Sequence, residues 1–240
     1  MSVSPLVIAH RGASGQAPES TLAAFRLALE QGADGIECDV RLTADRIPVI
    51  LHDETLERTT SGRGRLQDLA WSDLQGFDAG SWFGPVFRGE RVPTLRQVLE
   101  ELGADCAWFL EIKELAGTAL TISLVRELGL EQRATLLSFL PQVLADARRL
   151  APALPRVLNS SLVSLHALDE AVGLGCAGLD VPYEKLTAEL ARATQDAKLA
   201  LYAWGVEGAR AIDRARRLGL AGIITAWPDK ARRRLAGEQG

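Results

Sequence analysis

Two carboxylates lie two residues apart in an apolar stretch, within the sequence GIECDVRLTADRIPVILHD of residues 35–53. Successive side chains of an extended strand point to opposite faces, so Glu37 and Asp39 share one face and their apolar neighbours share the other. Burying two carboxylates on an apolar strand costs free energy unless a cation or hydrogen-bond donors accompany them. The pair therefore indicates either structural ion pairs at a strand end or a site that holds a cation.

Ionisable residues also end other apolar runs. His10 and Arg11 follow the run LVIA, and Glu111 and Lys113 end the run AWFLEIK. The run PVIL is followed by His52. The C-terminal ends of parallel barrel strands meet at one rim, which is where barrel active sites lie. Seven side chains would meet there: His10, Arg11, Glu37, Asp39, His52, Glu111 and Lys113.

Three carboxylates at one rim, Glu37, Asp39 and Glu111, would repel one another in a poorly solvated site. A hard divalent cation relieves this repulsion, and ligation by oxygen alone suits Mg²⁺ or Ca²⁺. The three cysteines are too scattered for a structural zinc site. Arg11 and Lys113 beside such a cation would hold a phosphate group. The residue types alone thus point to phosphoryl chemistry assisted by one divalent cation.

The chain has three histidines, and two of them end apolar runs. His166 lies in the helical pattern SLHAL, where we expect a structural or surface role. Imidazole gains and loses a proton near neutral pH, so His10 and His52 could act as general acid and general base beside a phosphate.

Alternating strands and helices must position these side chains. We expect parallel strands over residues 6–9, 35–40, 107–113, 134–139, 156–159, 178–182, 199–204 and 222–225, and helices over 19–31, 94–102, 116–128, 141–150, 164–172, 187–196, 207–218 and 228–236. Eight strand–helix units predict an α/β fold, a closed TIM (β/α)8 barrel. An open doubly wound sheet is the alternative, but no glycine-rich dinucleotide turn follows the first strand.

One connection is too short for a parallel crossover. Only residues 41–46 separate Val40 from Ile47, so we expect an antiparallel hairpin with a turn near residues 44–45. This hairpin would bring His52 roughly opposite Glu37.

The least regular stretch follows, over residues 53–91, and we interpret it as a small insertion after the second barrel strand. We expect its aromatic residues to form a small core of their own, and the alternative is a wall over the active site. These residues are Phe77, Trp82, Phe83 and Phe87.

Length and charge limit the other possibilities. A chain of 240 residues fits one domain, residues 1–240, with residues 41–92 as hairpin plus insertion. The net charge of −4 argues against a nucleic-acid partner. We expect no signal peptide, no stable membrane association, reduced cysteines and a cytoplasmic location. The oligomeric state is left open.

Several motifs occur in the order typical of one enzyme family. They are AHRG at residues 9–12, PEST at 18–21, GADGIECDV at 32–40, PVILHDETLERTTSGRG at 48–64, VPTL at 92–95, LEIK at 110–113, SF at 138–139, AWGV at 203–206 and GIIT at 222–225. Together they span nearly the whole chain. The chain closely resembles the glycerophosphodiester phosphodiesterase family, particularly its shorter cytoplasmic bacterial members.

This resemblance implies a TIM barrel that hydrolyses a glycerophosphodiester, a small-molecule substrate, to an alcohol and glycerol 3-phosphate. It implies one divalent cation held by Glu37, Asp39 and Glu111, and an acid/base pair of His10 and His52. Arg11 and Lys113 would bind the phosphate, and Trp204 would pack against the substrate or belong to the core. The nucleophile would be the glycerol 2-hydroxyl, through a cyclic phosphate, or water.

Five positions depart from the family pattern. Ser20 stands where asparagine is usual, Gly205 and Glu207 differ around the W-x-V-N motif, and Ala221 and Ala226 replace aspartates that flank GIIT. Another residue of the PEST segment, Glu19, is expected in the first turn of the following helix, or else near Arg11 or the cation. We expect the five departures to affect substrate preference and local hydrogen bonding and not the activity itself, since the predicted ligands and both histidines are intact.

Two alternatives stay open. The chain could be a related barrel enzyme of the phospholipase D type that acts on lysophospholipids or sphingolipids. It could also be a barrel that binds phosphodiesters without hydrolysing them, against which the intact histidine pair argues.

Overall fold

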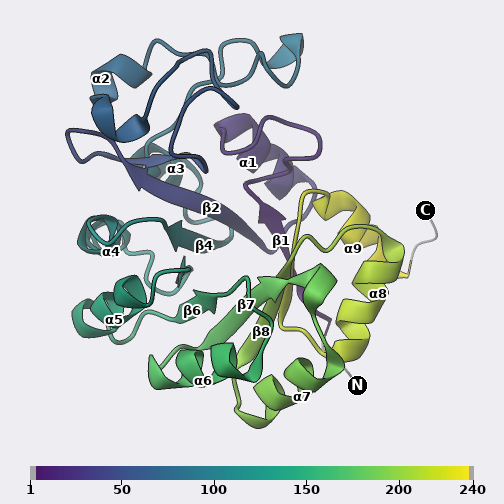
Figure 1. Cartoon of the computed structure of the whole chain (residues 1–240). Helices are drawn as coiled ribbons and strands as arrows, with labels where there is room; N and C mark the ends of the chain where they lie inside the picture. The colour runs from purple at the N-terminus through teal and green to yellow at the C-terminus, as the bar shows by residue number, and fades with distance from the viewer. Residues whose placement is uncertain (1–3, 238–240) are drawn as a thin grey trace.

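Eight parallel strands form a closed barrel in the computed structural model, which describes residues 4–237 (Figure 1). β1 pairs with β9 on one side and with β2 on the other, which closes the sheet. The predicted TIM (β/α)8 barrel is confirmed, and the alternative of an open sheet is wrong. The barrel strands are β1 (Leu6–His10), β2 (Gly35–Leu42), β4 (Ala107–Ile112), β5 (Ala134–Ser138), β6 (Arg156–Asn159), β7 (Gly178–Pro182), β8 (Ala200–Trp204) and β9 (Gly222–Thr225).

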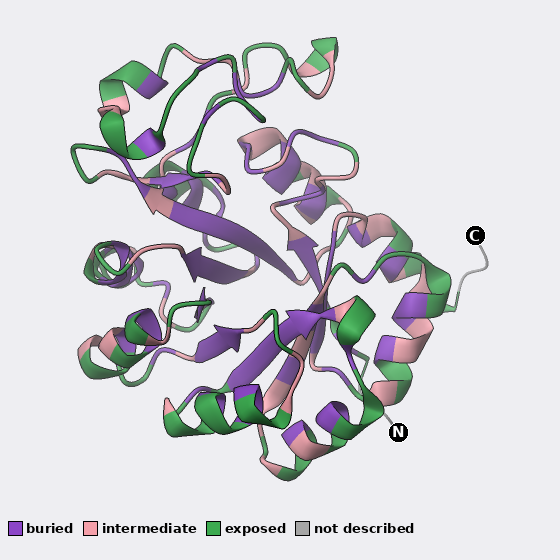
Figure 2. Ribbon diagram, viewed as in Figure 1, coloured by how far each residue is buried: buried purple, intermediate pink, exposed green. Residues whose placement is uncertain are grey.

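Helices cover the outside of the barrel, with buried inner faces and exposed outer faces (Figure 2). None of the helices within residues 4–237 is both long and apolar enough to cross a membrane. The longer helices are α1 (Leu22–Glu30), α3 (Leu95–Leu102), α4 (Gly117–Glu127), α5 (Pro141–Leu150), α6 (Leu165–Gly173), α7 (Ala188–Asp196), α8 (Ala209–Leu218) and α9 (Pro228–Ala236). The short ones are α2 (Trp71–Leu74), η1 (Leu66–Asp68), η2 (Pro85–Phe87) and η3 (Tyr183–Lys185).

Hydroxyl side chains determine where several helices begin. Thr21, Thr94, Ser164 and Thr187 each accept a hydrogen bond from the backbone N–H three residues ahead, at 3.0–3.3 Å. Such capping satisfies a backbone donor that the first helical turn leaves free. Because Thr21 caps α1, the expectation that Glu19 lies in the first turn of this helix is wrong.

Apolar side chains fill two layers of the barrel. Residues that point outward from the strands, such as Trp108 and Leu110, pack against the helices. Residues that point inward form a plug across the barrel interior, made of Ile8, Phe109, Leu137, Val157 and Ile224. Polar side chains lie above this plug, because on β1, β4 and β6 a polar residue follows the plug residue two positions later, on the same face of the strand.

The predicted hairpin is confirmed. β3 (Pro48–Ile50) runs antiparallel to β2, with Val40 opposite Ile50. Leu51 N donates to the Asp39 carbonyl at 3.1 Å. The register therefore carries His52 to the level of Cys38, one residue from the predicted position opposite Glu37.

The insertion, which lies at the top of Figure 1, has a small core of its own beside β3. This core is mainly aliphatic, and only Phe77 of the four aromatic residues packs against it. Trp82, Phe83 and Phe87 instead contact one another edge to face, with ring centroids 5.6 Å apart, and Trp82 is 42 % exposed. The expectation that the aromatic residues make this core is thus largely wrong. None of the four lines the cavity described below.

Asp78 organises the outer part of the insertion. Its Oδ1 accepts from the N–H groups of Gly80 and Ser81 at 2.9 and 2.6 Å, and its Oδ2 accepts from Gly89 N at 2.7 Å. These backbone donors hold the pKa of Asp78 well below its ordinary value.

We expect Asp78→Ala to lower the free energy of unfolding by about 1–3 kcal/mol, because three backbone donors lose a charged acceptor. Hydrogen exchange should accelerate at the amides of Gly80, Ser81 and Gly89, and chemical denaturation measures the stability. The control is Asp105→Ala, since the exposed Asp105 carboxylate makes no hydrogen bond within residues 4–237. Equal stability and exchange in the two variants would contradict this role.

Candidate active site

The strand register brings the predicted carboxylates together. His10 of β1 lies beside Glu37 of β2, and Asp39 of β2 lies beside Glu111 of β4. One oxygen from each of Glu37, Asp39 and Glu111 lies within 4.8 Å of the others. All three side chains are buried, with at most 6 % of any residue exposed. They therefore form a compact acidic cluster inside the barrel rim.

Two cations contact this cluster. Lys113 Nζ forms an ion pair with Asp39 Oδ1 at 2.8 Å and another with Glu111. Arg11 Nε lies 3.2 Å from Asp39 Oδ2, and the backbone N of Arg11 donates to Glu37 Oε2 at 3.2 Å. Asp39 Oδ2 still accepts no well-aligned hydrogen bond from the part of the chain that the structure describes. This oxygen thus remains available to a further cation.

Charges and burial oppose each other within the cluster. Burial raises the pKa of Glu37 well above its ordinary value, and repulsion from Asp39 and Glu111 adds to the effect. Burial also acts to raise the pKa of Asp39, but Lys113 and Arg11 outweigh it and hold this pKa below its ordinary value. Glu37 is therefore the least compensated carboxylate, which is the condition that a divalent cation would relieve.

A count of charges gives the same result. The three ionised carboxylates exceed Arg11 and Lys113 by one negative charge. A divalent cation would leave one net positive charge, which complements the single negative charge of a phosphodiester.

His10 lies at the end of β1, with Nε2 3.9 Å from Glu37 Oε2. Burial and, to a smaller extent, the positive charge of Arg11 lower the pKa of His10 to about 4. The neutral imidazole therefore predominates at pH 7, and a neutral imidazole can accept a proton.

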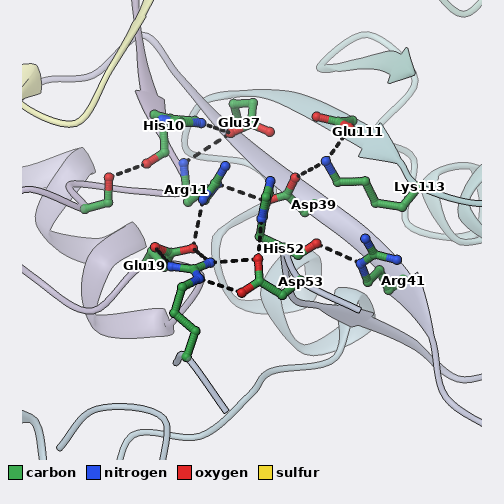
Figure 3. Close-up of polar contacts among 12 residues, drawn as sticks. His10, Arg11, Glu19, Glu37, Asp39, Arg41, His52, Asp53, Glu111 and Lys113 are labelled. Carbon is green, nitrogen blue, oxygen red and sulfur yellow. Dashed lines mark hydrogen bonds and ion pairs between the residues drawn. The ribbon is translucent and has the colours of Figure 1, made fainter. Parts of the chain in front are cut away.

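His52 is held by a chain of charged residues that Figure 3 shows below the acidic cluster. Its Nδ1 lies 2.7 Å from Asp53 Oδ1, and Arg58 pairs with both Asp53 and Glu19. Glu19 also accepts from Arg11 at 2.9 Å. The expectation that Glu19 lies near Arg11 is thus confirmed. Through Arg58, Glu19 also links the β1–α1 segment to the insertion.

The predicted residues surround a cavity of about 220 Å³. The lining contains six predicted ionisable residues, His10, Arg11, Glu37, His52, Glu111 and Lys113, together with Phe139, Asn159, Asp180, Trp204 and Ile224. Asp39 lies just behind the surface of the cavity, at 1 % exposure. Trp204 packs edge to face on Phe139, with ring centroids 5.6 Å apart. The structure thus brings together the six ionisable lining residues that the sequence predicted to meet at one rim.

Four of these lining residues were missed: Phe139, Asn159, Asp180 and Ile224. Asn159 and Asp180 are polar residues at or near the ends of apolar strands, which is the same signal that identified Glu37 and Glu111. Phe139 directly follows β5. The two remaining predictions for isolated side chains agree with the structure, since His166 is exposed and the three cysteines are buried and free.

Comparison with known proteins identifies the family. Residues 10–230 match the model of the Glycerophosphoryl diester phosphodiesterase family. The chain belongs to this family. The predicted resemblance and the prediction of an enzyme of this family are thereby confirmed.

Individual relatives of the glycerophosphodiester phosphodiesterase family agree over most of their length. A glycerophosphodiester phosphodiesterase of Caldanaerobacter subterraneus subsp. tengcongensis is 36 % identical over 93 % of this chain and 95 % of its own length. An Oleispira antarctica phosphodiesterase, solved in complex with the product sn-glycerol-3-phosphate, superposes with a TM-score of 0.91 at 31 % identity, covering 97 % of both chains. A glycerophosphodiester phosphodiesterase from Agrobacterium tumefaciens str. C58 gives a TM-score of 0.85 at 30 % identity, covering 95 % of this chain and 98 % of its own.

The departures from the family pattern have local explanations. Ser20 adopts a left-handed conformation with φ of 62°, which asparagine tolerates better than serine. Gly205 has φ of 73°, which glycine adopts without strain. Ala221 makes only sheet hydrogen bonds through its backbone.

Glu207 and Ala226 depart together. Glu207 accepts from Thr225 Oγ1 and from Ala226 N, each at 2.9 Å. In the family pattern, an aspartate directly after GIIT stands at the position of Ala226. In this chain the carboxylate that supports the end of β9 comes instead from Glu207, in the segment after β8.

We expect Glu207→Ala to destabilise the protein by about 1–2 kcal/mol, because the buried Thr225 hydroxyl and the Ala226 N–H lose their acceptor. Thermal unfolding measures the loss. Glu184→Ala is the matched control, because Glu184 is exposed and its carboxylate makes no hydrogen bond to the described residues. Restoring the acceptor in the double variant Glu207→Ala/Ala226→Asp should recover part of the stability. A melting temperature that stays at the control value would refute the bracing role.

Proposed function

We propose that this chain hydrolyses glycerophosphodiesters to an alcohol and sn-glycerol 3-phosphate in the cavity between His10 and Trp204. Family membership supports the reaction class, and the solved relative with bound sn-glycerol-3-phosphate supports the product. The observation that carries the proposal is the arrangement of the cavity wall. Two carboxylates, two cations and two imidazoles face one volume of about 220 Å³, and the third carboxylate, Asp39, lies directly behind them.

Glu37, Asp39 and Glu111 would hold one divalent cation, Mg²⁺ or Ca²⁺. The donor set fits, since it consists of clustered carboxylate oxygens and leaves one negative charge uncompensated. When bound, the cation supplies charge stabilisation for the phosphoryl oxygens as negative charge builds up on them. Lys113 and Arg11 would bind the phosphate from the rim, because both already lie beside the acidic cluster.

The two histidines differ in their surroundings, and we assign them different roles. Burial lowers the pKa of His52, but the hydrogen bond between Nδ1 and Asp53 opposes this effect and orients the ring, so we assign this residue as the general acid for the leaving alcohol. His10 has no hydrogen-bonded carboxylate partner among the described residues, and its imidazole is neutral at pH 7, so we assign it as the general base. The base would take the proton of the nucleophile, either the glycerol 2-hydroxyl or water. Trp204 would pack against the carbon chain of the substrate.

Chelation should abolish hydrolysis of glycerophosphocholine, and added Mg²⁺ or Ca²⁺ should restore it. Calorimetric titration of the metal-free protein should give one binding site, which Glu37→Gln and Asp39→Asn weaken by an order of magnitude or more. Glu184→Gln is the control, since that side chain is exposed and outside the cavity. Full activity after rigorous chelation would reject the cation.

His10→Ala and His52→Ala should each lower turnover of glycerophosphocholine by about 10²–10⁴-fold. A p-nitrophenyl ester of glycerol 3-phosphate needs little acid assistance, because nitrophenolate leaves readily. His52→Ala should therefore lose much less activity on this ester, whereas His10→Ala should lose as much as before. His166→Ala serves as the control on the helix surface. Equal losses for the two variants on both substrates would contradict the assignment.

One observation favours a second candidate substrate. Large apolar side chains are exposed in the segments after β4, β5 and β6, at the same end of the barrel as the cavity: Leu115, Phe139, Leu140, Leu162 and Leu165. An acyl chain could lie on them, so the phospholipase D type reaction on lysophospholipids is a second candidate. Comparing glycerophosphocholine with lysophosphatidylcholine separates the two. A barrel without catalysis would bind glycerophosphocholine tightly and release no product.

The organisation of the chain as one domain over residues 1–240 stays a prediction, as do the cytoplasmic location and the absence of nucleic-acid partners. The net charge of −4 supports the last of these.

A further inference from the structure

Two buried polar side chains lie across the barrel from the acidic cluster. Asn159 ends β6 and Asp180 lies on β7, directly beside it in the strand register. In the order of the eight barrel strands, β6 and β7 stand four places from β1 and β2, so they face these strands across the interior. Both residues line the same cavity as His10 and Glu37. The cavity therefore has a second polar wall.

This second wall has unused hydrogen-bonding capacity. Asn159 is 4 % exposed and Asp180 is 2 % exposed, yet Oδ1 of each has no hydrogen-bond partner within residues 4–237. Buried polar atoms in folded proteins are nearly always paired, because leaving one unpaired costs free energy. Two such atoms, side by side on one cavity wall, point to a ligand that supplies their partners.

The surroundings restrict the chemistry of that ligand. Phe139, Trp204 and Ile224 also line the cavity, and Lys113 Nζ lies 5.9 Å from the centre of the Phe139 ring, but no lysine or arginine that lines the cavity comes from the side of β6 and β7. A side without cations is unsuited to a second phosphate, whereas aromatic rings and two polar groups suit a short carbon chain that carries hydroxyls. A quaternary ammonium group brings no N–H donor and would leave both oxygens unpaired.

Asp180 is suited to a hydroxyl in either protonation state. Burial raises the pKa of Asp180 well above its ordinary value, and the charge of Glu111 adds to this. The protonated carboxyl both donates and accepts, and the ionised one accepts, so a hydroxyl can pair with either.

We propose that Asn159 and Asp180 form a hydroxyl-binding subsite, which holds the hydroxyl-bearing carbon chain of the diester opposite the phosphate-binding side. This inference rests on the proposed function and adds to it the residues that select the substrate. The hydroxyls could come from the glycerol arm or from the alcohol arm, and the test distinguishes these two sources.

The test compares three diesters with the complete, cation-loaded protein. Bis(p-nitrophenyl) phosphate has no hydroxyl, glycerophosphocholine has hydroxyls on the glycerol arm alone, and glycerophosphoglycerol has them on both arms. Asn159→Leu and Asp180→Leu should lower kcat/KM on the hydroxyl-bearing substrates by roughly tenfold to a hundredfold and leave bis(p-nitrophenyl) phosphate within about threefold. Asp180→Asn should retain most of the activity, because its amide can still pair with a hydroxyl.

The pattern of losses identifies the arm. A loss on both glycerol diesters assigns the subsite to the glycerol arm, and a loss on glycerophosphoglycerol alone assigns it to the alcohol arm. Thr118→Val is the matched control, since Thr118 is also fully buried with an unpaired hydroxyl but lies on α4 outside the cavity. Equal losses on all three diesters, or no loss on any, would overturn the subsite.

Direct binding separates this proposal from the proposed function. If the wild-type protein hydrolysed none of the three diesters, the proposed function would fail. The subsite would then be tested by calorimetry with sn-glycerol 3-phosphate and methyl phosphate. Asp180→Leu and Asn159→Leu should weaken only the former, and equal affinities would reject the subsite. Should the leucine variants not fold, Asp180→Ala and Asn159→Ser decide by the same comparisons.

Discussion

The electrostatic balance inside the barrel rim is the constraint on which the site depends. Glu37, Asp39 and Glu111 are buried within a few ångströms of one another, because parallel pairing of β2 with β4 places Asp39 beside Glu111. Arg11 and Lys113 offset two of the three charges. Burial of charge at this density is costly unless the charges are paired. The excess negative charge therefore costs stability, and this cost is what the cation proposed for the site would remove.

The insertion contributes to this balance from outside the barrel. It supplies His52 and Asp53, which follow β3, and Arg58, which joins Asp53 to Glu19. Glu19 in turn pairs with Arg11 of the β1–α1 segment. Each member of this chain of ion pairs is partly exposed, so each contact alone stabilises the fold little. Their combined effect is to orient His52 and Arg11 relative to each other, which the barrel strands alone could not do.

Much of this could be predicted from the sequence, because strand periodicity and strand ends are local signals. The i, i+2 spacing of Glu37 and Asp39 and the short connection after β2 gave the acidic cluster and the hairpin. Glu19 was harder, because its position depends on Thr21 beginning α1 and on a distant partner, Arg58. The insertion aromatics were misjudged because composition does not say which side chains aliphatic neighbours will cover. Asn159 and Asp180 were missed for a different reason: neither belongs to a charged cluster, and only the closed barrel brings them opposite one.

The depth of the cavity and its two unlike walls follow from a single feature of the barrel. The apolar plug of Ile8, Phe109, Leu137, Val157 and Ile224 closes the interior below the site. Polar residues further along the inward face of the strands must then face a common space above it. On β2 and β4 these residues are carboxylates that Arg11 and Lys113 compensate, whereas on β6 and β7 they are an amide and a carboxyl whose Oδ1 atoms have no hydrogen-bond partner within residues 4–237. A diester that spans this space would meet charge at its phosphate and hydrogen-bonding groups at its carbon chain. The polarity of the proposed substrate is in this sense matched by the order of strands around the barrel.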